Sequence, residues 1–402
     1  MPPLLLHLFT GLFFLLPSSG GRIPVSLSED VRLTGRFLLE EAVAHFDHPG
    51  TEIAFTTTAG CSAAFIGLSQ RVDPTYGEPN YFEVFVDGRR VVSEEGALHS
   101  FSTESFTSSR VETVKLADLD PSRSHFISVF KGTEPQWNEI AVRPNYVTFH
   151  GLTLEGDDAC GLGTPQPAPS RRLEFIGDSI TCGYCNLCSK EQQEAAPPED
   201  GLEWLRHLRR GSPRGSSLQL GDNGAELESH WDSWAPRLAR SLDAEFHTAA
   251  WSGYGLVHNC CGGNTTMPMI YRRTLATVPE SHWNMSQWVP DGVVINLGTN
   301  DGQVATTSAF TDAYVDLCTN ITGAYGPQVE LFLACGPMST EYCDAVAETI
   351  SRLTEQGLRA HFLDQRNAAA NQCCAHPSAD DDALMATQGA AFISRVMGWQ
   401  QL

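Results

Sequence analysis

The feature that most restricts the fold of this chain is an alternation of strand-like and helix-like segments after residue 172. Apolar runs typical of buried strands lie at 173–176, 245–249, 293–297, 329–334 and 360–363. Between and after them, apolar residues recur at helical spacing, within 231–242, 310–321, 342–353 and, behind Asp380 to Asp382, up to Val396. Such alternation predicts a parallel sheet covered by helices on both faces.

The first half of the chain has a different pattern. Residues 28–155 contain short runs of β-branched and aromatic residues, such as 82–86 and 125–130, separated by turn signals such as Asp87-Gly88. This pattern predicts an all-β sandwich or jelly roll. A linker rich in glycine and proline follows at 156–171. We therefore expect a jelly-roll domain followed by a three-layer α/β/α domain over 172–402, with a polar surface insertion at about 186–228.

The N-terminus and the cysteines indicate secretion. Residues 4–16 are almost wholly apolar but too short to span a bilayer, and small residues follow, so 1–20 is expected to be a signal peptide; an uncleaved anchor is the alternative. The chain has 12 cysteines, an even number, and its glycosylation sequons lie at Asn264, Asn284 and Asn320. We expect an extracellular protein, or one of the secretory lumen, with no membrane association after cleavage.

The spacing of Cys182, Cys185 and Cys188 would suit a metal ion, because thiolates two residues apart can share one. In an oxidising compartment, disulfides are the favoured interpretation, and no metal or cofactor is expected. The adjacent pairs Cys260-Cys261 and Cys373-Cys374 are expected to bridge to cysteines elsewhere.

A formal net charge of −22 disfavours nucleic acid and anionic membranes as partners, because both would repel the chain. It mildly favours neutral polysaccharides over polyuronates. Solubility alone would also explain it.

In open parallel sheets, ligands bind beyond the carboxyl ends of the strands. Reactive residue types follow the expected strands here: Gly177-Asp178-Ser179, then Ser252-Gly253, then Thr299-Asn300-Asp301, and late in the chain His376-Pro377. Ser179 would attack as the nucleophile and His376 would take its proton. The backbone N–H groups of Ser179 and Gly253 and the Asn300 amide would hold the oxyanion.

Each of these residues also has a structural interpretation. Ser179 could cap a helix, Asn300 could form a turn with Asp301 in solvent, and Gly253 could serve backbone geometry alone. Because residue 181 is threonine, the chain lacks the Gly-x-Ser-x-Gly elbow of α/β-hydrolases.

In order along the chain, Gly177-Asp178-Ser179, Gly253, Asn300 and His376 resemble the four blocks of the SGNH (GDSL-like) hydrolases. The stretches 252–271 and 294–301 are most similar to carbohydrate esterase family two, whose members place a jelly roll before the hydrolase domain. The resemblance implies metal-free removal of acetyl groups from polysaccharides or oligosaccharides such as acetylated xylan or glucomannan. Some members also bind cellulose in the same cleft.

The sequence departs from that family before the histidine, where it has Cys374-Ala375 in place of Asp-Trp, and Cys373 where SGNH enzymes carry the orienting acid. We therefore expect a Ser179–His376 dyad in which a backbone carbonyl orients the imidazole. Trp251, Tyr254 and Tyr271 are candidate sugar-binding aromatics, although aromatic residues more often lie in cores. A polysaccharide-binding protein with weak catalysis, and an SGNH acyltransferase or lipid esterase, are the alternative functions.

Overall fold

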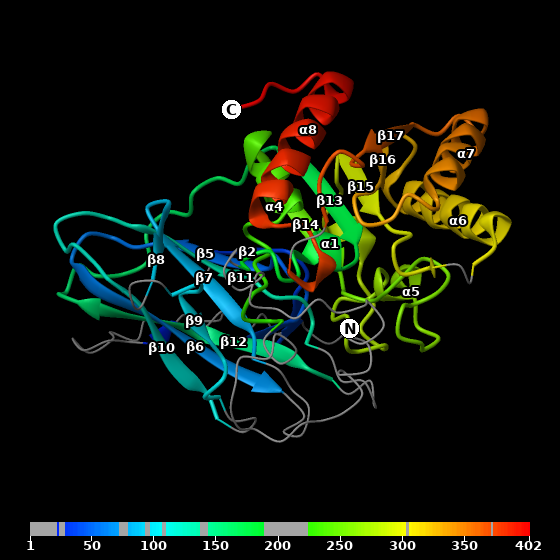
Figure 1. The fold of residues 1–402 in the computed structure, drawn as a ribbon. Coiled ribbons are helices and arrows are strands. Elements are labelled where there is room, and N and C mark those ends of the chain that lie inside the picture. The colour runs from blue at the N-terminus through cyan, green and yellow to red at the C-terminus, as the bar shows by residue number, and fades with distance from the viewer. Residues whose placement is uncertain are drawn as a thin grey trace, which may run out of the picture.

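A computed structural model describes residues 22–23, 29–71, 79–92, 97–106, 110–136, 144–188, 224–302, 305–370 and 373–402. The expected signal peptide and residues 189–223 of the expected insertion lie outside the described residues. The described part forms an antiparallel β-sandwich followed by a parallel α/β domain, and the two lie side by side (Figure 1). This confirms the predicted fold class.

The C-terminal domain is built on a parallel sheet with the strand order β14-β13-β15-β16-β17. Its strands occupy all five predicted places, at Arg171–Gly177 (β13), Ala244–Ala250 (β14), Gly292–Asn296 (β15), Glu330–Cys335 (β16) and Ala360–Asp364 (β17). The chain starts in β13, crosses to β14 on one side, and returns past β13 to β15 on the other. The loops that follow β13, β14 and β15 therefore lie next to one another at the carboxyl edge.

Helices cover both faces of this sheet because side chains of each strand alternate between two apolar clusters (Figure 1). In β15, for example, Val293 and Ile295 join one cluster and Val294 joins the other. The first cluster includes residues of α6 (Thr307–Tyr325) and α7 (Cys343–Glu355), and the second includes residues of α4 (Trp234–Ser241) and α8 (Ala379–Met397). The shorter helices are α1 (Ser179–Cys182), α5 (Met267–Ile270), η2 (Met285–Gln287) and η4 (Cys373–Ala375).

The N-terminal domain packs two antiparallel sheets around a third apolar cluster. One sheet has the order β10-β6-β12-β4-β3, with β1 also paired to β12; the other has the order β2-β5-β11-β7-β8, with β9 also paired to β7. Their bounds are Arg22–Ile23 (β1), Val31–Thr34 (β2), Leu38–Glu40 (β3), Val43–Phe46 (β4), Glu52–Thr56 (β5), Cys61–Arg71 (β6), Tyr81–Val86 (β7), Arg89–Val91 (β8), Phe101–Ser102 (β9), Glu112–Asp118 (β10), Phe126–Lys131 (β11) and Tyr146–Gly156 (β12).

Buried polar contacts join the two domains. Arg36 of the sandwich forms an ion pair with Glu174 of β13 at 2.9 Å, and both side chains are fully buried. Asp47, which follows β4, accepts hydrogen bonds from the backbone N–H groups of Ala276 and Thr277, both at 2.9 Å. Because an unpaired buried charge is strongly destabilising, these pairs fix how the domains are joined. Among the described residues, no helix combines the length and the apolar character needed to cross a bilayer.

Candidate active site

Ser179 lies at the carboxyl end of β13, at the start of helix α1. Asp178 is the N-cap, and its side chain accepts a hydrogen bond from the Ile180 backbone N–H at 3.1 Å. The cap is therefore Asp178, and the helix-cap interpretation of Ser179 is wrong. A side chain at Gly177 would collide with Thr181, because its Cβ would stand 2.0 Å from the threonine hydroxyl oxygen. The glycine thus lets the chain turn directly from strand to helix.

The structure brings Ser179 and His376 together although 197 residues separate them in the sequence. His376 Nε2 lies 2.7 Å from the Ser179 hydroxyl oxygen, and His376 Nδ1 lies 2.6 Å from the carbonyl oxygen of Cys374. A carbonyl oxygen only accepts hydrogen bonds, so Nδ1 carries the ring proton and Nε2 is left as an acceptor. This is the tautomer that can take a proton from the serine.

Burial keeps this imidazole neutral. It lowers the pKa of His376 to about 4, and the hydrogen bond to the Cys374 carbonyl offsets only part of that effect. At neutral pH His376 is therefore a free base, which is the form a proton acceptor requires.

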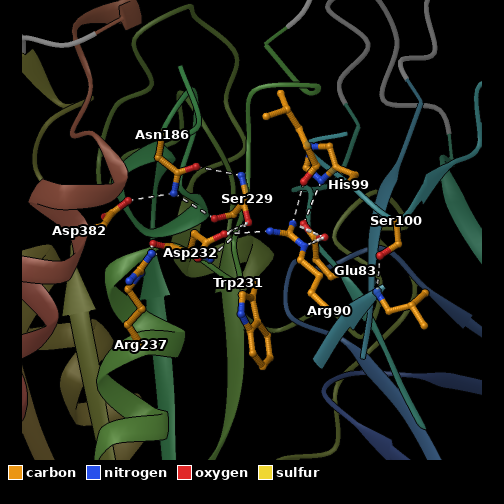
Figure 2. A network of polar contacts seen from close by, with 12 residues as sticks. Glu83, Arg90, His99, Ser100, Asn186, Ser229, Trp231, Asp232, Arg237 and Asp382 are labelled. Atoms are coloured by element: carbon orange, nitrogen blue, oxygen red, sulfur yellow. Dashed lines mark hydrogen bonds and ion pairs between the residues drawn. The ribbon is translucent and has the colours of Figure 1, made fainter. Parts of the chain in front are cut away.

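The segments on both sides of His376 are held against the segment after α1 by covalent and polar contacts. Cys374 forms a disulfide with Cys185, and the backbone carbonyl of Asn186 accepts a hydrogen bond from the Ala379 N–H at 3.0 Å. The Asn186 side chain donates to Asp382 of α8 at 2.9 Å. Figure 2 shows this contact continuing through Ser229 and Asp232 to Arg90 of the N-terminal domain. These contacts hold the segment that carries His376 next to the segment that follows Ser179.

Within the described part of the chain, no aspartate near His376 in sequence is hydrogen-bonded to its ring. Asp364 pairs with Arg366 at 2.7 Å, and Asp381 forms a capping box with Ser378 at the start of α8. Asp382 accepts from Asn186 and from the Trp234 backbone N–H, at 2.9 and 3.2 Å. Among the described residues, His376 Nδ1 therefore has a backbone carbonyl as its partner rather than a carboxylate.

Two backbone amides at the sheet edge are available for an oxyanion. Among the described residues, the N–H groups of Ser179 and Gly253 have no acceptor. Gly253 has φ = 81°, in the left-handed region, and its carbonyl accepts from the Cys260 N–H at 3.0 Å. An added Cβ there would stand 3.1 Å from the Cys260 sulfur, so glycine suits this position on two counts.

Asn300 lies beside these groups, but its amide is already bonded. Nδ2 donates to Asp178 Oδ2 at 3.1 Å and to the carbonyl of Tyr254 at 3.0 Å, which accounts for both of its hydrogens. Asp301 is fully buried and accepts from the backbone N–H groups of Leu256, Val257 and His258, so the interpretation of Asp301 as solvated is wrong. Both residues thus hold the loop that follows β14.

The structure separates the three candidate sugar-binding aromatics. Trp251 and Tyr271 are each only 3% exposed and belong to the apolar cluster under α6, which favours a role in the core over sugar binding for both. Tyr254 is half-buried and stacks on Trp251 with ring centroids 4.7 Å apart. Tyr271 also donates to Glu174 at 2.6 Å, as a core tyrosine does when its hydroxyl needs a partner.

Tyr184 is an aromatic residue of the site that the sequence patterns did not indicate. Its ring packs edge-on against the His376 imidazole, with centroids 5.1 Å apart. It stands between Cys182 and Cys185, and the disulfide of Cys185 to the histidine segment is what brings it there. The spacing of the cysteines was the available signal, but it does not reveal which cysteine is bonded to which.

The cysteines depart from expectation in two places. Cys182 is a buried free thiol, whereas Cys185 and Cys188 are disulfide-bonded, so the disulfide interpretation of the cluster holds for two of its three members. Cys260 and Cys261 bond to each other rather than to distant partners. The remaining bridges described are Cys61–Cys160 and Cys335–Cys343.

One buried group among the described residues has metal-ligand chemistry. Ligand atoms of Glu134, Cys182 and Glu228 all lie within 4.8 Å of one another. Lys131 is buried beside them, and attraction to Glu228 and Glu134 partly offsets the burial that lowers its pKa to about 8. The Lys131 ammonium balances negative charge of the two glutamates, as a metal cation in the same place would.

A parallel sheet with Ser179, Gly253, Asn300 and His376 at its carboxyl edge defines an SGNH-type hydrolase domain. The model of the GDSL-like Lipase/Acylhydrolase family matches residues 175–388. The chain belongs to this family, which confirms the interpretation of the four sequence blocks.

Two curated relatives are similar over most of the chain. The cellulase/esterase CelE of Acetivibrio thermocellus is 30% identical over 83% of this chain, and the chain spans 36% of its length. An acetylxylan esterase/glucomannan deacetylase of Cellvibrio japonicus is 22% identical over 98% of both chains.

Solved structures match across both domains. A family two carbohydrate esterase from Clostridium thermocellum, in complex with cellohexaose, has a TM-score of 0.71 at 25% identity, covering 92% of this chain and all of that one. Another from Cellvibrio japonicus has a TM-score of 0.72 at 19% identity, covering 95% of this chain and 99% of that one. The predicted order of a jelly roll before an SGNH domain is therefore confirmed.

Proposed function

We propose that the chain is a secreted serine esterase that removes O-acetyl groups from polysaccharides, with Ser179 as the nucleophile and His376 as the base. The observation that carries the proposal is the 2.7 Å contact between Ser179 Oγ and His376 Nε2, combined with the Nδ1 contact to the Cys374 carbonyl that fixes the ring tautomer. A neutral imidazole in this tautomer is what a serine hydroxyl needs for activation.

The reaction has two stages, acetylation of Ser179 and hydrolysis of the acetyl-serine. Ser179 Oγ attacks the acetyl carbonyl carbon while its proton passes to His376 Nε2. The oxyanion is held by the N–H groups of Ser179 and Gly253 and by one N–H of the Asn300 amide, which turns away from one of its two acceptors. The oxyanion collapses when the sugar hydroxyl leaves with the proton from His376. Water, deprotonated by the same nitrogen, then attacks the acetyl-serine, and the proton passes from His376 to Ser179 Oγ as the ester bond breaks and acetate leaves. No step needs a metal or a cofactor.

The substrate class rests on similarity and on charge. A relative that matches nearly the whole chain is named for acetylxylan and glucomannan, and one similar structure holds cellohexaose. The net charge of −22 favours neutral chains of this kind over polyuronates. Exposed sequon asparagines at 264, 284 and 320, and the disulfides, support passage through an oxidising secretory compartment.

The test compares wild type with Ser179→Ala on 4-nitrophenyl acetate, on longer acyl esters, and on acetylated xylan and glucomannan. We expect acetate to be preferred and the variant to lose turnover while melting like wild type, since the hydroxyl adds little to the core. Turnover retained by Ser179→Ala would overturn the nucleophile assignment. Equal polysaccharide affinity of both proteins without acetate release would favour a binding protein, and a preference for long acyl chains would favour a lipid esterase.

A further inference from the structure

Glu134 connects the N-terminal domain to the loop that carries Gly253. It lies three residues beyond the end of β11, and it is only 8% exposed. Its Oε2 accepts a hydrogen bond from the backbone N–H of Ser252 at 2.5 Å. Ser252 is the residue directly before Gly253, so a side chain of the sandwich domain contacts the main chain next to one of the two proposed backbone oxyanion donors.

The same carboxylate also contacts helix α1. The Cys182 sulfur lies within 4.8 Å of a Glu134 carboxylate oxygen, and Cys182 lies in the short helix that Ser179 begins. Glu134 therefore lies between the two elements that present a backbone oxyanion N–H group. A residue between these elements is well placed to set the distance and the angle between their amides.

The backbone of Glu134 is itself fixed. Its N–H donates to Glu228 Oε1 at 2.7 Å, and its carbonyl accepts from the buried Lys131 ammonium at 2.8 Å. The backbone that carries the Glu134 carboxylate is therefore held in place by two hydrogen bonds. Burial raises the pKa of Glu134, and the Ser252 hydrogen bond and the Lys131 ammonium offset part of that shift by favouring the charged form. In the charged form the carboxylate accepts N–H hydrogen bonds about twice as strong as those between neutral groups, which resists displacement of the loop.

The loop needs such a restraint for a physical reason. Gly253 adopts φ = 81°, and a glycine has an open choice of other backbone conformations. Oxyanion donors stabilise the transition state only when they are oriented before the reaction, because reorientation during it would cost free energy. Fixing the residue before Gly253 removes part of that cost.

We propose that Glu134 is a positioning residue contributed by the N-terminal domain, which holds the Ser252–Gly253 main chain so that the oxyanion hole is preformed. The inference rests on the proposed function in taking Gly253 as an oxyanion donor. The sandwich domain then completes the active site rather than serving only as a neighbour.

The test uses the full chain with Glu134→Ala and Glu134→Gln, and Asp47→Ala as a matched control. Asp47 is also a buried sandwich carboxylate that accepts backbone N–H groups of the hydrolase domain, but at Ala276 and Thr277, outside the site. Thermal melting of all three variants reports what each lost contact does to stability. The rates are measured with 4-nitrophenyl acetate.

For Glu134→Ala we expect kcat to fall by about tenfold or more with KM little changed, as for the weakening of an oxyanion-hole donor. Glu134→Gln keeps an acceptor oxygen on a side chain of the same length and should restore most of the rate. Asp47→Ala should lower the melting temperature and leave kcat unchanged. If Glu134→Ala melts lower than wild type and keeps its kcat, the proposal is wrong. If that variant does not fold, Glu134→Asp takes its place, because its shorter side chain withdraws the acceptor from the Ser252 N–H, and a wild-type kcat in Glu134→Asp decides against the proposal.

A second readout separates this inference from the proposed function. Phosphonylation of Ser179 by a fluorophosphonate places a phosphoryl oxygen in the oxyanion hole and needs no sugar. Slower labelling of Glu134→Ala than of Asp47→Ala supports the positioning role, even if wild type releases no acetate from any polysaccharide. Equal labelling rates for the two variants would contradict it, even if wild type is an active deacetylase.

Discussion

His376 Nδ1 lies 2.6 Å from the carbonyl oxygen of Cys374, two residues earlier in the chain. The contact requires an unusual backbone, because Cys374 and Ala375 have φ values of 57° and 55°, in the region that favours glycine. Each such residue costs free energy of the order of 1–3 kcal/mol unless its surroundings hold it. The Cys185–Cys374 disulfide is the covalent part of those surroundings.

The pH profile follows from the burial of this imidazole. His376 must be neutral to accept the serine proton, and burial lowers its pKa to about 4, against about 6.5 for a free histidine. We expect kcat/KM to stay high down to mildly acidic pH and to fall only near pH 4. The measurement is kcat/KM for 4-nitrophenyl acetate from pH 3.5 to 8. An acid limb near 6.5 would mean that the ring is solvated in the working enzyme.

The contribution of His376 to folding stability should also decrease as the pH falls. Below about pH 6.5 the unfolded chain protonates His376, whereas the folded chain does so only near 4. The unfolded state therefore binds more protons in that window, and the contribution of His376 to stability declines as the pH falls through it. Rates at low pH are accordingly taken below the melting temperature measured at each pH.

A backbone carbonyl in place of the orienting acid predicts which aspartates are dispensable. Asp364→Asn, Asp380→Ala and Asp381→Ala should each leave kcat close to wild type, while His376→Ala should lose nearly all of it. Asp382→Ala is a separate case, because it removes the acceptor of Asn186 and of the Trp234 N–H and should destabilise the fold. An aspartate variant that matches the loss of His376→Ala while melting like wild type would be the missing acid, and the dyad would be wrong.

The disulfide at Cys374 should matter for rate as well as for stability. The double variant Cys185→Ser/Cys374→Ser frees the strained segment before His376, so we expect a fall in kcat together with a loss of stability of about 2–4 kcal/mol. Cys335→Ser/Cys343→Ser is the matched control, since that bridge links β16 to α7 and should affect stability alone. Kinetics and denaturant unfolding of both variants distinguish the two effects.

Chelators should leave activity unchanged, because the proposed reaction uses no metal ion. EDTA-sensitive activity that zinc restores would instead assign a metal role to Glu134, Cys182 and Glu228.

The fold class and the places of the candidate residues were predictable because they depend on local patterns. Strand and helix periodicities indicate a parallel sheet, and Ser179, Gly253 and Asn300 follow the carboxyl ends of its strands. What the sequence did not reveal depends on which side chains meet in the fold. The position of Tyr184 against His376 depends on contact between distant segments of the hydrolase domain. The Cys260–Cys261 bond and the free thiol of Cys182 depend on a choice of disulfide partners that cysteine spacing leaves open. The burial of Trp251 and Tyr271 is similar, because an aromatic residue after a strand can equally line a cleft or close a core.

Asn300 offers the sharpest remaining test of the oxyanion hole. Its amide hydrogens are bonded to Asp178 Oδ2 and the Tyr254 carbonyl, so it contributes to catalysis either by turning one N–H to the oxyanion or by bracing these two loops. The residue Asn296 is a matched control, because its amide also donates to two acceptors, the Gly336 carbonyl and Gln365, at the end of β15 and outside the hole. For Asn300→Ala we expect kcat to fall by about 10²–10³, the usual effect of losing one oxyanion donor.

Asn296→Ala removes a similar pair of buried hydrogen bonds, so it should lower the melting temperature at least as much while kcat changes little. The measurements are kcat and KM on 4-nitrophenyl acetate, with melting curves for both variants. If Asn300→Ala raises KM and leaves kcat unchanged, Asn300 binds the substrate rather than the transition state. If both asparagine variants lose kcat in proportion to their loss of stability, Asn300 acts by bracing the loops, and the hole consists of the Ser179 and Gly253 amides alone.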